Sequence, residues 1–126
     1  MQAVDTNVLV RLIARDDPHQ VAVADAFVSR GAWVSLVVLV ETVWVLGAVY
    51  NRGRRELATA IEMLLSHKKL VLQDSDTVSM ALELFRSSSS LEFSDCLILQ
   101  LARKAGHLPL GTFDRGLAKI EGAQKL

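Results

Sequence analysis

The apolar stretch from Val34 to Tyr50 constrains the fold of this chain more than any other feature of the sequence. It is marginally short for a membrane span of about 20 residues. One carboxylate, Glu41, lies near its centre, where a charge costs about 2.5–3.5 kcal/mol on membrane insertion. The stretch therefore predicts an apolar helix buried inside a globular protein, with no membrane contact.

Short strand-like runs alternate with helical patterns along the rest of the chain. The strands are expected at 1–4, 33–34, 70–72, 108–112 and 123–126. A helix is expected to begin at Ser94, with an inward face of Leu97, Ile98, Leu101, Ala102 and Ala105. Alternating strands and helices predict an α/β fold with a parallel sheet, whose functional crevice lies at the carboxyl ends of the strands.

The composition narrows the functional classes. Hydrophobic residues make up 51% of the chain, which suits a folded domain rather than a disordered one. The 14 basic and 14 acidic residues cancel, so any nucleic-acid contact must depend on local patches. The one cysteine, Cys96, is expected to pack in the core and fits a reducing compartment such as the cytoplasm. The N-terminus does not have the pattern of a signal peptide.

Acidic residues occupy positions that favour a metal site. Asp5 and Asp114 each stand where an expected strand ends and a helix begins, and Asp95 lies in the first turn of a helix. Mg²⁺ prefers oxygen ligands and keeps several waters. Together with Glu41, these residues could hold such a cation, which would activate a water for attack on a phosphodiester.

Each of these carboxylates also has a simpler interpretation. Aspartate is a favoured helix N-cap, so the three aspartates could serve only as caps. A buried Glu41 could instead form an ion pair with a distant arginine, such as Arg11 or Arg52. The residues alone leave both interpretations open.

Four short motifs resemble those of PIN-domain proteins. They are Val4-Asp5-Thr6-Asn7, Val40-Glu41-Thr42, Phe93-Ser94-Asp95-Cys96-Leu97-Ile98 and Gly111-Thr112-Phe113-Asp114. Their order and spacing are similar over essentially the whole chain, and the length is similar to that of bacterial VapC-type toxins. The resemblance implies a single PIN-like nuclease domain, 1–126, with a three-layer α/β/α sandwich and a parallel sheet of about five strands.

The resemblance also implies an activity and its residues. It implies a Mg²⁺- or Mn²⁺-dependent endoribonuclease in which a metal-activated water attacks RNA in line. Asp5 and Asp95 would be the direct metal ligands, and Glu41 and Asp114 would complete the catalytic acidic site. Hydrogen bonds from the side chains of two further residues would hold the carboxylates or a water: Asn7 and Thr112. The implied partners are a cognate antitoxin that blocks the site and a second copy of the chain.

The densest basic cluster is formed by Arg52, Arg54 and Arg55. These residues could guide RNA phosphates toward the acidic site. Alternatively, they could be solvated residues at helix ends, because cations are favoured near helix C-termini.

Three other functions compete with RNA cleavage. A catalytically inactive PIN-like module would serve only in protein interaction, and the intact carboxylates argue against it. A receiver-type phosphoryl-transfer domain would need a lysine after a late strand, whereas the one downstream candidate, Lys119, lies in an expected helix. A DNA-cleaving nuclease could use the same acidic site.

Overall fold

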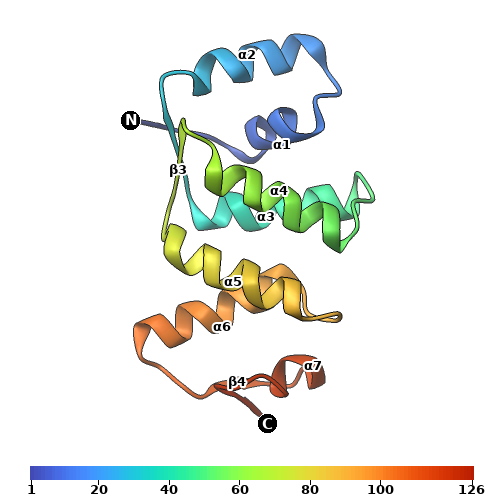
Figure 1. Ribbon diagram of the computed structural model, residues 1–126, viewed down its shortest axis with the longest axis vertical. Coiled ribbons are helices and arrows are strands. Elements are labelled where there is room, and N and C mark those ends of the chain that lie inside the picture. Colours follow the sequence, from blue (N-terminus) through green and yellow to red (C-terminus); the bar gives the residue numbers. More distant parts are fainter. The chain divides into compact units, whose positions relative to one another are not determined.

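The computed structural model describes all 126 residues and contains seven helices and five strands (Figure 1). These elements form two compact units, Met1–Ser75 and Asp76–Leu126, and each is described by itself. No helix combines the length and the apolar character that a membrane crossing requires.

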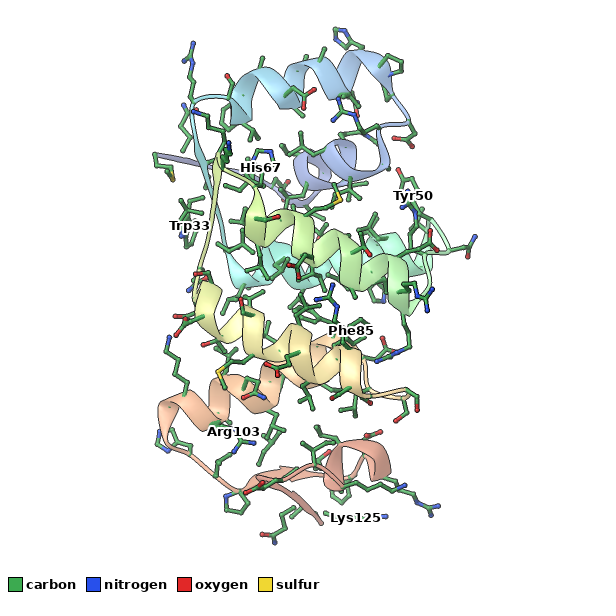
Figure 2. All side chains as sticks on the ribbon, in the orientation of Figure 1. Trp33, Tyr50, His67, Phe85, Arg103 and Lys125 are labelled. Atoms are coloured by element: carbon green, nitrogen blue, oxygen red, sulfur yellow. The ribbon has the colours of Figure 1, made fainter.

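A three-stranded parallel sheet forms the centre of unit 1. Its strand order is β1 (Gln2–Ala3), β2 (Ala32–Val34), β3 (Leu70–Leu72). The first and last residues of β2 and of β3 are buried. The middle residues, Trp33 and Val71, pair with each other across the two strands and are 38% and 49% exposed. Figure 2 shows Trp33 directed away from the helices of this unit. One face of the sheet therefore packs into the core of unit 1.

Four helices complete unit 1: α1 (Thr6–Ala14), α2 (Pro18–Val28), α3 (Leu36–Ala48) and α4 (Arg54–Ser66). Local sequence explains where two of them begin. The Asp17 side chain caps α2 with Pro18 in the first turn, and the Ser35 hydroxyl accepts from the Val38 N–H of α3 at 3.1 Å. Helix α1 packs against α2 and α3, and α4 packs against α3 and β3.

Helix α3 differs from its prediction. The sequence predicts a helix buried inside the protein, but only the face that carries Leu39, Val43 and Leu46 is buried. Val37 and Trp44 are 73% and 67% exposed. The prediction of an apolar helix is confirmed, and the prediction of full burial is wrong. The helix carries apolar side chains on all sides, whereas only one side packs against other elements.

Unit 2 contains three helices and a second parallel sheet. Its elements are α5 (Ser75–Ser87), α6 (Phe93–Ala105), β4 (Leu110–Thr112), α7 (Arg115–Ala118) and β5 (Ala123–Lys125). Phe85 of α5 meets Phe93 of α6 edge-on, with ring centroids 6.0 Å apart. Cys96 is fully buried, which confirms the predicted core thiol. The predicted inward face of α6 is only partly right, because Ile98 is 50% exposed.

The strand pairing confirms a helix-rich α/β fold with parallel strands. Every strand pair is parallel. The sequence predicts one sheet of about five strands, whereas the strands form a three-stranded and a two-stranded sheet.

Candidate functional site

Asp5 lies at the carboxyl end of β1. The Val4 N–H donates to the Trp33 carbonyl at 3.1 Å, so strand pairing continues to the residue before Asp5. Asp5 then caps α1, because its Oδ1 accepts from the Thr6 N–H at 2.7 Å. The side chain is exposed, and Oδ2 makes no hydrogen bond. The capping interpretation is confirmed, and capping leaves one oxygen open to a ligand.

The next two residues differ in environment. Asn7 is exposed, and its side chain makes no hydrogen bond. Thr6 is 4% exposed, and its hydroxyl is buried without a partner. Sequence reasoning missed Thr6, although its spacing to the buried Leu9 and Val10 places it on the inward face of α1.

Glu41 is exposed, which corrects the prediction of a buried carboxylate. It makes no hydrogen bond or ion pair. The proposed pairing with Arg11 is wrong, because that guanidinium binds Asp16 and Tyr50, each at 2.9 Å. No partner neutralises Glu41, so its charge is available to a cation.

The Arg11 contacts belong to a polar network that joins α1 to the end of α3. The Tyr50 hydroxyl accepts from Arg11 and donates to Asp16 Oδ2, both at 2.9 Å (Tyr50 is labelled in Figure 2). The hydrogen bond from the Tyr50 hydroxyl is the largest cause that holds the pKa of Asp16 below its ordinary value. The hydrogen bond from Arg11 also lowers this pKa. The network therefore ties together the helix that Asp5 caps and the helix that carries Glu41.

Asp95 lies in the first turn of α6 in unit 2. It is half-buried, and its Oδ2 accepts from the Glu92 N–H at 3.3 Å. This bond is one half of a capping box in which Glu92 is the N-cap and Asp95 is the third helical residue, so the interpretation of Asp95 as the N-cap itself is wrong. The other oxygen makes no hydrogen bond.

Asp114 occupies the turn between β4 and α7. Its Oδ2 accepts from the Leu117 N–H at 2.7 Å and caps the short helix. The Asp114 N–H donates to the Thr112 hydroxyl at 3.0 Å, so Thr112 holds the main chain of this turn. Asp114 is exposed and, like Asp5, retains one oxygen without a hydrogen bond.

Gly116 allows the Asp114 turn to approach the segment that leads into α6. A Cβ on Gly116 would lie 3.2 Å from Ser90 Oγ and 3.3 Å from Asp114 Oδ2. Both distances are tighter than ordinary contacts of a side-chain carbon, so a residue with a side chain would push these groups apart. Sequence reasoning did not single out Ser90 and missed this contact.

The four acidic residues are divided between the units. Asp5 and Glu41 belong to unit 1, whereas Asp95 and Asp114 belong to unit 2. Neither unit by itself gathers three or more His, Cys, Asp or Glu side chains into a metal-holding group. The donor chemistry nevertheless fits a hard divalent cation, because each carboxylate has at least one oxygen without a hydrogen bond.

The arginine cluster lies at the start of α4. Arg54 and Arg55 stand in its first turn, and the Arg52 N–H donates to the Leu46 carbonyl at 3.0 Å just before it. The interpretation of residues near a helix C-terminus therefore fits Arg52, which follows α3, and is wrong for Arg54 and Arg55. The amide dipoles at a helix N-terminus disfavour cations, so the dipole of α4 does not explain Arg54 and Arg55.

Comparison with known proteins supplies the family. A model of the family described as PIN domain matches residues 3–123. PIN domains are generally metal-dependent nucleases, which act on nucleic acids and typically use divalent cations. No curated protein matches the chain, and no solved structure matches it. Because the family model matches almost the whole chain, this protein belongs to the PIN-domain family.

Proposed function

We propose that this protein is an endoribonuclease that hydrolyses RNA phosphodiester bonds with Mg²⁺ or Mn²⁺. One observation carries the proposal: a PIN-domain chain retains all four motif carboxylates, each with an oxygen that makes no hydrogen bond. Residues 1–126 would act as a single nuclease domain. A family member used only for protein interaction would not need this set.

The four carboxylates would have two different roles at the cation. Asp5 and Asp95 would be the direct ligands, and Glu41 and Asp114 would complete the negative charge around the cation. The bound cation would lower the pKa of an attacking water and neutralise charge on the phosphate. Side-chain hydrogen bonds would support these groups, from Asn7 to a carboxylate or water and from Thr112 at the Asp114 turn.

The arginines at the start of α4 would contact RNA phosphates. Arg55 is exposed in the first turn of α4, where the helix dipole disfavours a cation, so a contact with phosphate would explain its presence. Replacing Arg52, Arg54 and Arg55 with alanine should weaken RNA binding and reduce its salt slope by about 2, at about 0.7 per phosphate contact.

The control for this variant is the pair Lys68→Ala and Lys69→Ala, exposed residues beyond the other end of α4. Binding titrations at several salt concentrations would measure both. A slope unchanged in the arginine variant, or reduced equally in the lysine pair, would exclude the specific role of the arginines.

The biological role we propose is that of a toxin of the VapC type. The partners would be a cognate antitoxin that blocks the acidic site and a second copy of the chain, and the reducing cytoplasm would suit the one free thiol, Cys96. Light scattering would test the dimer. Growth arrest on induction, absent from the Asp5→Ala variant, would test toxicity.

The activity itself is tested with the purified chain. Mixed RNA and DNA pools are incubated with Mg²⁺, with Mn²⁺ or with chelator, beside the Asp5→Ala variant. We expect RNA fragments only with metal and only from the wild type. Cleavage of DNA alone would indicate the DNA nuclease, and no cleavage of either pool would favour the interaction module.

A further inference from the structure

The hydroxyl of Thr6 is a buried polar group without a partner. Thr6 is 4% exposed, and its Oγ1 makes no hydrogen bond. Thr42, the other buried threonine of unit 1, is fully buried but donates its hydroxyl to the Val38 carbonyl at 2.7 Å. Buried polar groups are nearly always hydrogen-bonded, because an unpaired one lowers the stability of the fold. The Thr6 hydroxyl therefore requires an explanation.

Its position links it to the acidic residues of unit 1. Thr6 is the first residue of α1, and its N–H donates to the Asp5 carboxylate at 2.7 Å. Its side chain shares the inward face of α1 with Leu9 and Val10, and α1 packs against α3, which carries Glu41. The unpaired hydroxyl thus belongs to the residue whose N–H holds the carboxylate of Asp5.

We infer that Thr6 is a positioning residue whose hydroxyl gains its hydrogen-bond partner when a divalent cation binds, an inference that rests on the proposed function. The partner is a water that the cation retains, since Mg²⁺ keeps several of its waters in proteins. Hydrogen bonds of this kind orient the ligands of a metal and raise its affinity. The hydroxyl destabilises the metal-free fold and is satisfied in the metal-bound one.

Two substitutions at Thr6 separate these effects. Thr6→Val keeps the shape of the side chain and removes the hydroxyl, whereas Thr6→Ser keeps the hydroxyl. Melting in chelator measures the metal-free fold, and calorimetric titration with Mn²⁺ measures affinity without relying on activity. We expect Thr6→Val to melt higher than the wild type in chelator and to bind Mn²⁺ about 10- to 100-fold more weakly. Thr6→Ser should bind Mn²⁺ nearly as the wild type does.

The control is Thr42→Val, which removes a hydroxyl whose hydrogen bond is already made. It should lower the melting temperature in chelator, opposite in sign to Thr6→Val. Wild-type affinity for Mn²⁺ in Thr6→Val, or a lower melting point of that variant in chelator, would overturn the role of Thr6 alone. A wild-type chain that binds no Mn²⁺ would overturn this inference and the proposed function together.

Discussion

At the scale of single residues, the motif aspartates combine two roles that the sequence presents as alternatives. Asp5 and Asp114 each cap a helix with one oxygen, and the other oxygen stays open. The sequence predicts the caps because aspartate before a helix is a local signal. It does not predict that Glu41 is exposed, because exposure depends on which side of α3 packs.

Substitution at Asp5 should separate the two roles. Asparagine caps helices about as well as aspartate does, whereas alanine at an N-cap costs about 0.5–2 kcal/mol. We therefore expect Asp5→Asn to unfold at nearly the wild-type denaturant concentration in chelator and Asp5→Ala to unfold earlier. Both variants should lose metal-dependent RNA cleavage. An Asp5→Asn variant that still cleaves RNA would leave Asp5 with only its capping role.

At the scale of elements, the sequence predicts which segments form helices better than it predicts which faces pack. The apolar stretch around Glu41 forms α3, and α6 begins within one residue of the predicted start at Ser94, because these signals are local. In α6 the predicted inward face includes Ile98, which is half-exposed, and omits Phe93, which is buried. Apolar residues on several sides of a helix leave the choice of packed face to tertiary contacts.

Gly116 should be required for the close approach of α7 to Ser90. In Gly116→Ala the new Cβ would lie 3.2 Å from Ser90 Oγ and 3.3 Å from Asp114 Oδ2, so we expect lower stability, by about 1 kcal/mol. The matched control is Gly47→Ala within α3, where the new carbon would meet Leu57 at an ordinary 3.7 Å. That change should stabilise the fold by about 0.5–1 kcal/mol. Denaturant unfolding of both variants measures the contrast, and two stabilising results would contradict it.

The polar network between α1 and α3 should have a signature at acid pH. The pKa of Asp16 lies below its ordinary value of 3.8, first because of the Tyr50 hydrogen bond. Because folding lowers this pKa, the Asp16 carboxylate stabilises the fold at pH values above 3.8. That stabilisation is lost as the pH falls through the folded-state pKa. Tyr50→Phe should therefore raise the pKa of Asp16 toward 3.8, as measured by NMR titration.

An internal control comes from Asp25, whose pKa is held low by the Arg15 guanidinium. Tyr50→Phe should leave the pKa of Asp25 unchanged. If the pKa of Asp16 also stays low in this variant, the Tyr50 hydroxyl is not its main cause.

At the scale of the whole molecule, the alternation of strands and helices is enough to predict a parallel α/β fold. The acidic site that we propose is harder to predict, because its residues would come from segments as far apart as Asp5 and Asp114. Local patterns predict the place of the three aspartates at a strand end or in the first turn of a helix. They do not predict the contact between Gly116 and Ser90, which arises only when distant segments pack.

Calorimetric titration with Mn²⁺ tests most directly whether the four carboxylates hold one divalent centre. The wild type should bind Mn²⁺, and Asp5→Asn, Glu41→Gln, Asp95→Asn and Asp114→Asn should each bind it more weakly. Without metal, we expect Asp95→Asn to melt above the wild type, because it would remove one of the negative charges that the proposed site brings together. Wild-type affinity in the Glu41 and Asp95 variants, or no binding by the wild type, would contradict a shared site.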